Sequence, residues 1–517
     1  MIDPGSSSDP NHKKMDTRRR FLKSLLAAPV LGAGCAHVDS KTGIHKATTG
    51  TVPAYIAPPG SPRRIIHLVA DGMSSGTLAC ADHYSQIQRG RRLTWFEMLR
   101  RDDVRVGVMD VRSQNSIVTD SSASASAWGS GVRIPNGKVN QTSKGRPLVT
   151  LYELLGEAGW KRGLVTTTEI THATPAGFAA CVKSRADAED IAAQYLERRV
   201  DLALGGGRKY FLSDQRKDKR DLRIAFREAG YAVLETPKDL EKAPLDQRWI
   251  GLFSAGHLPF LVDQKGGLTQ VDPTPPLADL TRAALRNLVN SERFILQVEG
   301  GRVDHGSHNN DAAAAVWEMI GFDEALDVCL EFQREHPDTL LVMTTDHGTG
   351  NPGLNGMGDN YGQSSKLFRN VSRMRQSLPE IISRLQLAET PAAKLAVLKE
   401  STGYTPSTRR MDQLQPFLQK KGYALYDGLN SEVGALGQML GNHLGVSFTS
   451  TAHTSDHVPV LAVGPGADRF RGFVENTEIF DHYVEFAGIR FHNPQESLLA
   501  AQEAFLGGFD SAMPHHV

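Results

Sequence analysis

The sequence predicts an α/β protein: a three-layer α/β/α sandwich around a mostly parallel central sheet, with a helical insert. The first observation behind this prediction is an alternation, from Arg63 onward, of short apolar runs and longer amphipathic stretches. Near-continuous apolar runs are typical of strands that helices cover on both faces. The second observation is that carboxylates and imidazoles follow several of these runs, and parallel sheets bind ligands where their strands end.

Eight apolar runs are expected to form strands of this sheet. They are Ile65–Ala70, Val104–Met109, Gly163–Thr167, Asp201–Leu204, Ile250–Phe253, Phe294–Val298, Leu340–Thr344 and Val458–Val463. Helices are expected between them, including Ala186–Arg198, Pro276–Val289 and Ala312–Gln333.

The alternation stops after Asn351. Residues 354–445 are first Gly-rich and then helical in pattern, which indicates an insert, and its start lies close in sequence to Asp346 and His347. The α/β domain is therefore expected to comprise residues 63–353 and 446–517. The insert is a candidate for shaping ligand choice near these two residues or for a contact within a homodimer.

Composition and charge exclude several classes of protein. The 517 residues include 58 basic and 58 acidic side chains, so the formal net charge is zero and no surface for nucleic acid is expected. A hydrophobic content of 40% is enough for a large core, which excludes wholesale disorder. Four cysteines are too few for a disulfide scaffold, and no apolar run reaches the roughly 20 residues of a membrane-spanning helix.

Residues 1–36 have the pattern of an export signal, because a basic segment precedes a short apolar stretch that ends in small residues. Arg18 and Arg19, with Phe21 and the Leu-Lys that follows it, resemble a twin-arginine signal. This resemblance implies an exported protein of the periplasm or cell envelope. Cys35 ends a stretch similar to a lipoprotein box and is a candidate site for a lipid anchor. Residues 37–62, rich in Thr, Gly and Pro, are expected to form a linker.

Side chains that bind metals gather behind the predicted strands. They are Asp71, Glu299, Asp304, His308, Asp346, His347 and His453. Asp304 and His308 are one helical turn apart, so both can face one ion. A set of carboxylates and imidazoles with almost no cysteine is typical of a site for hard or borderline divalent metals.

Two serines are candidate nucleophiles. Residues 117–119 are expected to end a strand at Asp120, and the small residues after Ser121 favour a helix whose N-terminus attracts an anion. The competing candidate is Ser74, because Gly72–Gly76 fits the G-x-S-x-G motif of metal-free esterases. That motif follows the first strand after the signal, so no earlier strand supplies an oxyanion loop. It also leaves the metal-binding side chains unexplained.

The motifs resemble the alkaline phosphatase family from about Arg63 to Gly488. Residues 118–128, which contain Ser121, are similar to the family's nucleophile motif, and residues 298–308 are similar to its metal motif. Further matches are Thr345–His347, His453–Thr454, the segment Thr171–Pro175 and the turn Gly205–Gly207. The resemblance implies hydrolysis of small-molecule phosphate monoesters through a phosphoserine at Ser121.

The resemblance also implies two zinc ions and one magnesium ion. The first zinc set is Asp304, His308 and His453. The second zinc set is Asp71, Asp346 and His347, with Ser121. The magnesium set is Asp71, Thr174 and Glu299. The same ligand types can also bind Co²⁺, Mn²⁺ or Mg²⁺, so other divalent metals stay open as alternatives.

The remaining residues implied by the resemblance lie around the phosphate. Arg185 corresponds to the arginine that binds phosphate, and Asp120 would position it. His172 and His305 fall at neighbouring positions that vary within the family. A phosphodiesterase or sulfatase is the main alternative within the same superfamily. The magnesium set and Arg185 favour monoesters, and a non-catalytic binder is disfavoured because no expected ligand is missing.

Overall fold

The computed structural model describes residues 37–38, 45–46, 56–358 and 361–495. The predicted signal, including Arg18, Arg19 and Cys35, lies outside the described residues, as does most of the linker 37–62. The chain forms two units, 1–50 and 51–517. In the first, β1 (His37–Val38) pairs with β2 (His45–Lys46) in antiparallel fashion. Among the described residues, no helix combines the length and the apolarity needed to cross a membrane.

The second unit is built on a ten-stranded sheet with the order β16-β4-β15-β10-β3-β9-β5-β6-β8-β7. Its strands are β3 (Arg64–Val69), β4 (Arg105–Asp110), β5 (Lys161–Glu169), β6 (Leu202–Gly206), β7 (Tyr231–Leu234), β8 (Arg248–Leu252), β9 (Phe294–Glu299), β10 (Thr339–Thr344), β15 (Val458–Val463) and β16 (Gly472–Glu475). Only β15 runs antiparallel to its neighbours. The predicted, mostly parallel sheet is therefore confirmed.

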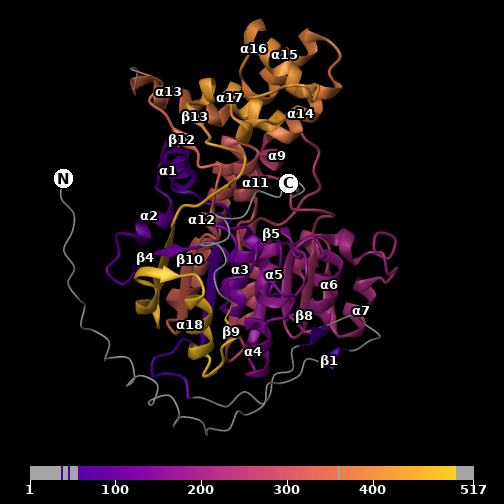
Figure 1. Cartoon of the computed structure of the whole chain (residues 1–517), viewed down its shortest axis with the longest axis vertical. Coiled ribbons are helices and arrows are strands. Elements are labelled where there is room, and N and C mark those ends of the chain that lie inside the picture. Colours follow the sequence, from indigo (N-terminus) through magenta and orange to yellow (C-terminus); the bar gives the residue numbers. More distant parts are fainter. Residues whose placement is uncertain (1–36, 39–44, 47–55, 359–360, 496–517) are drawn as a thin grey trace, which may run out of the picture. The chain divides into compact units, whose positions relative to one another are not determined.

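Helices cover both faces of the sheet (Figure 1), which explains why every residue of β9 and β10 is buried. The first layer contains α1 (Ser75–Arg89), α2 (Thr94–Met98), α9 (Leu261–Gly266), α10 (Leu277–Leu288) and α12 (Ala312–Glu335). The second contains α3 (Ser121–Ser130), α4 (Leu151–Glu157), α5 (Ala173–Ala179) and α18 (Glu478–Phe486). The other helices of the sandwich are α6 (Ala188–Glu197), α7 (Leu222–Glu228), α8 (Pro237–Glu241) and α11 (Arg302–His308).

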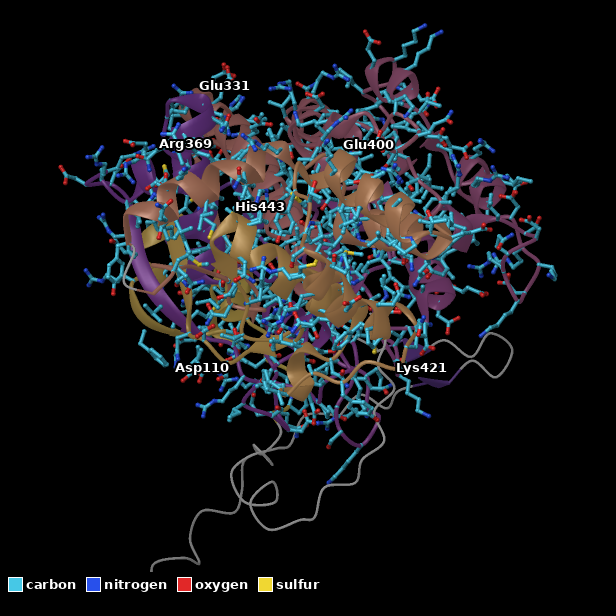
Figure 2. The ribbon with its side chains drawn as sticks, turned by 90° about the horizontal axis from the view of Figure 1, so that it is seen from above. Asp110, Glu331, Arg369, Glu400, Lys421 and His443 are labelled. Carbon is cyan, nitrogen blue, oxygen red and sulfur yellow. The ribbon has the colours of Figure 1, made fainter. Side chains whose placement is uncertain are left out.

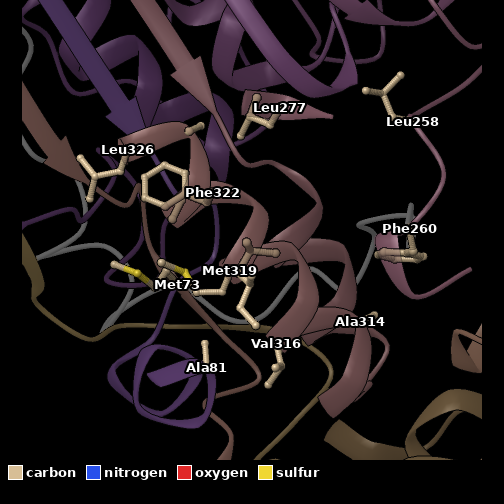
Figure 3. Close-up of a cluster of buried hydrophobic side chains, with 14 of the residues drawn as sticks. Met73, Ala81, Leu258, Phe260, Leu277, Ala314, Val316, Met319, Phe322 and Leu326 are labelled. Carbon is tan, nitrogen blue, oxygen red and sulfur yellow. The ribbon is translucent and has the colours of Figure 1, made fainter. Parts of the chain in front are cut away.

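A large apolar core lies between the sheet and the first layer. Figure 3 shows one part of it, where Met319 and Phe322 of α12 lie near Met73, in the connection between β3 and α1, and Ala81 of α1. These four side chains are almost completely buried. Packing of this kind fixes α1 and α12 on the sheet and so fixes the strand ends between them.

The predicted helical insert is confirmed. Its helices are α13 (Ser364–Phe368), α14 (Leu378–Leu387), α15 (Pro391–Thr402), α16 (Thr408–Leu418) and α17 (Glu432–Leu444). The ends of the segment lie side by side, because β12 (Gly353–Leu354) pairs with β13 (Val446–Ser447). Seen from above, charged side chains such as Arg369, Glu400 and Lys421 are spread over this part of the unit (Figure 2).

The eight predicted strands are all present, with ends that differ by at most two residues. Two edge strands, β7 and β16, were not predicted. β16 has the sequence Gly-Phe-Val-Glu and exposes Phe473, so it shows no continuous apolar run. β7 is apolar along its length but has only four residues. Edge strands lack a neighbour on one side and often keep a polar or exposed pattern.

The predicted strand at residues 117–119 is wrong, since this segment is irregular. Its backbone is paired with a side chain instead of a neighbouring strand. Asn136 donates from Nδ2 to the Val118 carbonyl, and the Asp120 N–H donates to Asn136 Oδ1. Ile117 is 68% exposed, so its apolar character does not reflect burial in a sheet.

Candidate active site

Three adjacent strands bring the predicted carboxylates together. β3 lies between β10 and β9 in parallel register, and the three strands end level with one another. Glu299 is the last residue of β9, and Asp71 and Asp346 lie two residues beyond the ends of β3 and β10. Gly72, at φ +73°, then lets α11 approach, because a Cβ there would lie 2.7 Å from Cα of Asp304. A glycine is required at this position both for its backbone conformation and for the close contact.

The predicted first zinc set converges at the end of α11. His308 Nε2 lies 3.3 Å from Asp304 Oδ2 and 3.0 Å from His453 Nε2. His453 comes from β14 (His453–Thr454), which pairs with β11 (Gly348–Thr349). This short ladder places residues far apart in sequence beside the strand end that carries Asp346.

The predicted second set surrounds His347. Its Nε2 lies 3.1 Å from Asp346 Oδ2, 3.7 Å from Asp71 Oδ1 and 3.1 Å from Ser121 Oγ. All of these side chains are buried, and the His347 ring stacks on His453 with centroids 3.6 Å apart. The two sets are therefore contiguous.

The hydrogen bonding of these buried carboxylate oxygens indicates whether the site fits divalent cations. Both carboxylate oxygens of Asp71, one each of Asp346 and Glu299, and the Thr174 hydroxyl are buried and make no hydrogen bond within the described residues. Burying unpaired carboxylates is costly unless a cation compensates them. Three groups have ligand atoms within 4.8 Å of one another: Asp304-His347-His453, Asp71-Asp346-His347 and Asp71-His172-Glu299. The donors therefore fit divalent cations, and His172 lies at the predicted magnesium set beside Thr174.

Hydrogen bonds on the far side of two imidazoles fix their tautomers. His308 Nδ1 donates to the carbonyl of Thr451 at 2.7 Å, and His453 Nδ1 donates to the carbonyl of Thr119 at 2.8 Å. In a neutral imidazole the other nitrogen then carries a lone pair. Both Nε2 atoms are thus ready to act as ligands, which is the arrangement usual around bound metals.

Burial and crowding of like charges shift the ionisation of the acids. Burial, with Asp346 and Asp304 nearby, raises the pKa of Asp71 well above its usual range. Burial likewise raises the pKa of Glu299 to about 7. A bound cation would compete with protons at both carboxylates, so metal binding is expected to release protons there.

Ser121 is the first residue of α3, directly after the N-cap Asp120. Asp120 Oδ1 accepts from the Ala123 N–H at 2.9 Å. The small residues of α3 are required by its contact with α5, since a Cβ on Gly129 would lie 1.8 Å from the Gly177 carbonyl oxygen. This contact fixes α5 against the helix that begins with Ser121.

Arg185 lies at the same end of α3. Its Nη1 is 3.2 Å from Asp120 Oδ2, and its Nη2 is 3.3 Å from His172 Nε2. Burial by itself would raise the pKa of Asp120, but Arg185 and several hydrogen bonds hold it below its usual value. His172 in turn lies edge-on to His305, with ring centroids 5.4 Å apart. The structure therefore brings together every site residue predicted from the sequence.

Two residues of this region were missed. His257, in the loop after β8, packs edge-on against His172 and His305. Thr349 makes hydrogen bonds to Asp304 and His347. His257 follows no strand directly, and a lone threonine gives no sequence signal. Proximity of Thr349 to Asp346-His347 was the only available indication.

Ser74, the competing nucleophile, has a structural role. It is the N-cap of α1, accepting from the Thr77 N–H at 3.2 Å, and its hydroxyl contacts Thr77 Oγ1 at 3.1 Å. None of the hydrogen bonds found within the described residues joins it to an imidazole. The geometry therefore offers no general base to activate Ser74.

Comparison with known proteins agrees with this geometry. The family model "Alkaline phosphatase" matches residues 62–489. Alkaline phosphatase 4 of Bacillus subtilis (strain 168) is 30% identical over 425 residues, which cover 80% of this chain and 87% of the relative. Streptomycin-6-phosphate phosphatase of Streptomyces griseus is 29% identical over 480 residues, which cover 84% and 92%. The crystal structure of Thermus thermophilus alkaline phosphatase superposes with a TM-score of 0.80 and 32% identity, covering 87% of this chain and 96% of that one.

Proposed function

This chain belongs to the alkaline phosphatase family and hydrolyses phosphate monoesters, and we propose that it does so through a phosphoserine at Ser121. The observation that supports Ser121 most directly is the 3.1 Å distance from its Oγ to Nε2 of His347. The serine also stands at the N-terminus of α3, whose positive end favours a phosphate.

We assign the metals of the site as two zinc ions and one magnesium ion. Asp304, His308 and His453 would hold the first zinc, and Asp71, Asp346 and His347, with Ser121, the second. Asp71, Thr174 and Glu299 would hold the magnesium, with His172 close by. Such ions, when bound, lower the pKa of a serine hydroxyl and offset the charge of the phosphate.

The other proposed roles in the reaction belong to side chains around the phosphate. Arg185, held by Asp120, would bind two phosphoryl oxygens with its planar guanidinium. Ser121 Oγ would attack phosphorus, so that the Oγ–P bond forms while the bond from phosphorus to the alcohol oxygen breaks. The proton of the Ser121 hydroxyl would pass to solvent, and the alcohol oxygen would take up a proton from solvent as it leaves. Water would then add to phosphorus and break the Oγ–P bond, releasing inorganic phosphate, and Ser121 Oγ would regain a proton. His172 and His305 would border the phosphate beside Arg185.

Three nitrophenyl substrates test this assignment. Turnover of p-nitrophenyl phosphate, bis-p-nitrophenyl phosphate and p-nitrophenyl acetate would be measured with and without chelator. The variants are Ser121→Ala and, as a control in a helix cap, Ser74→Ala. We expect monoester turnover that chelator abolishes, and a loss of roughly 10³-fold or more in Ser121→Ala. Chelator-resistant acetate hydrolysis that Ser74→Ala removes would overturn the assignment, as would an active Ser121→Ala enzyme.

We also propose that the insert, residues 354–445, borders the side from which the alcohol leaves. The Gly428 carbonyl accepts from the Thr451 N–H at 2.8 Å, and the Thr451 carbonyl accepts from His308 Nδ1 at 2.7 Å. One residue thus joins the insert to a proposed zinc ligand. In Figure 1 the insert helices lie beyond α11, which carries His308. A homodimer contact is the other role that we propose for the insert. Its test is the oligomeric state, measured by sedimentation, of a variant that lacks the insert.

We propose that residues 1–36 direct export through the twin-arginine pathway and that residues 37–62 link the signal to the catalytic domain, residues 63–353 and 446–517. Replacing Arg18 and Arg19 by lysine is expected to keep the protein in the cytoplasm. Activity of this variant in the periplasmic fraction would contradict the proposal. A Cys35→Ser variant tests the proposed lipid anchor. If Cys35 carries the anchor, the unsubstituted protein partitions with membranes and the variant does not.

A further inference from the structure

Thr349 connects the two proposed zinc sets. Its hydroxyl lies 2.6 Å from Asp304 Oδ1 and 3.2 Å from His347 Nδ1. Thr349 is completely buried, and it lies opposite His453 in the β11–β14 ladder. One hydroxyl therefore contacts a ligand from each set while its backbone is held beside a third ligand.

The direction of the two hydrogen bonds follows from the donors available. An ionised carboxylate accepts only, so the single hydroxyl hydrogen of Thr349 is donated to Asp304. The oxygen of Thr349 then accepts, and its partner must be an N–H at Nδ1 of His347. The Nε2 atom of a neutral His347 consequently keeps its lone pair, and it is this atom that faces Ser121 and Asp346.

The other two imidazoles of the site are oriented differently. His308 and His453 donate from Nδ1 to the backbone carbonyls of Thr451 and Thr119. No side-chain substitution can remove those acceptors. The corresponding contact of His347 is made by a side chain, so its contribution can be measured.

We propose that Thr349 is a positioning residue that couples the two zinc sets, by fixing the tautomer of His347 and the orientation of Asp304. This proposal rests on the ligand assignment of the proposed function. Removing the hydroxyl would weaken both sets together, because one oxygen serves a ligand in each. Loss of hydrogen bonds to metal ligands typically lowers metal affinity about 10–100-fold.

The test measures Zn²⁺ affinity of the metal-free protein by competition with a chromophoric chelator. Thr349→Val removes the hydroxyl and keeps the shape of the side chain, whereas Thr349→Ser keeps the hydroxyl. Thr339→Val is the matched control, since Thr339 is a buried threonine on β10 whose hydroxyl makes no hydrogen bond in the part of the chain that the structure describes. We expect about 10–100-fold weaker binding at both zinc steps in Thr349→Val. We expect near-original affinity in Thr349→Ser and Thr339→Val.

Several outcomes would overturn the proposal. Unchanged affinity in Thr349→Val contradicts it, as does equal weakening in Thr349→Ser, which would assign the effect to the methyl group. If Thr349→Val does not fold, Thr349→Ala serves as a second variant without the hydroxyl and is judged by the same comparison with Thr349→Ser. Because the measured quantity is Zn²⁺ affinity, an active Ser121→Ala enzyme would contradict the proposed nucleophile without affecting this result.

Discussion

Asp120 contacts Arg185 through one carboxylate oxygen, Oδ2 to Nη1 at 3.2 Å, and caps α3 through the other. A single carboxylate therefore orients both the helix that presents Ser121 and the guanidinium proposed to bind phosphate. Oδ2 also accepts from Ser122 Oγ and from the Gly137 N–H. The geometry of the phosphate site thus depends on Asp120 at several points.

This relationship predicts how Asp120→Asn behaves. The amide oxygen can still cap α3, but the ion pair with Arg185 is lost. We expect about 3–10-fold weaker inhibition by inorganic phosphate, because the charge-assisted hydrogen bond that orients Arg185 is lost. Arg185→Lys is expected to be more severe, because an ammonium group cannot bind two oxygens in a fork. Asp110→Asn, which removes the ion pairs of Asp110 with Arg112 and Arg133, is the control and should leave phosphate inhibition unchanged. Equal inhibition of Asp120→Asn and the original enzyme would contradict the role of Asp120.

The sheet and most of the site were predictable because both depend on simple patterns. Buried parallel strands are continuous apolar runs, and their carboxyl ends meet at one edge, so Asp71, Glu299 and Asp346 had to lie together. The contact of His453 with His308 was harder to predict from the sequence, since it depends on the two-residue ladder β11–β14. Sequence motifs, not periodicity, identified His453.

The features that were predicted wrongly or missed from the sequence also have specific structural causes. Residues 117–119 are two β-branched apolar residues and a threonine, yet they form no strand. Side chains pair with the backbone of Val118 instead, since Asn136 Nδ2 donates to its carbonyl and its N–H donates to Ser116 Oγ. Thr349 and His257 act through contacts with other side chains, and such contacts exist only after the loops are placed. No pattern of residue types along the chain encodes them.

Removing metal is expected to destabilise the protein, and more at high pH than at low pH. Burial raises the pKa of Glu299 to about 7, from 4.5. In the metal-free protein this stability is lost as the pH rises from about 4.5 through 7, because the unfolded chain gives up the proton first. We therefore expect chelator to lower Tm more at pH 8 than at pH 6, and added Zn²⁺ and Mg²⁺ to restore it. An identical Tm with and without chelator at pH 8 would contradict this prediction.

The insert is predicted to influence which alcohol is released. Tyr426, 57% exposed, packs against Gly428, whose carbonyl binds Thr451 beside His308. Because we propose that the insert borders the side from which the alcohol leaves, we expect an exposed aromatic ring of the insert to favour aromatic leaving groups. Tyr426→Ala should then lower kcat/KM for phenyl phosphate about 3–10-fold. The effect on glycerol phosphate should be smaller. Leu387→Ala, at an exposed position on α14, is the control. A uniform decrease for both substrates would contradict a role in leaving-group choice.

Glu318 provides a test of buried charge away from the active site. It lies on α12, is buried, and accepts from the Leu261 N–H through Oε1 at 2.7 Å. Burial raises its pKa from 4.5 to about 7. The folded state therefore holds a proton that the unfolded chain has already lost between these values. In this interval the free energy of unfolding falls as the pH rises.

Glu318→Gln removes that titration and keeps an oxygen to accept from Leu261. The variant should match the original protein at pH 5 and exceed its free energy of unfolding by about 1–3 kcal/mol at pH 8. Denaturant unfolding of the metal-free proteins at pH 5, 6, 7 and 8 measures the difference. Glu324→Gln, an exposed position on the same helix, is the matched control and should change little at any pH. If the difference between Glu318→Gln and the original protein is the same at pH 5 and pH 8, Glu318 is ionised in the folded state at both, and burial does not control its charge.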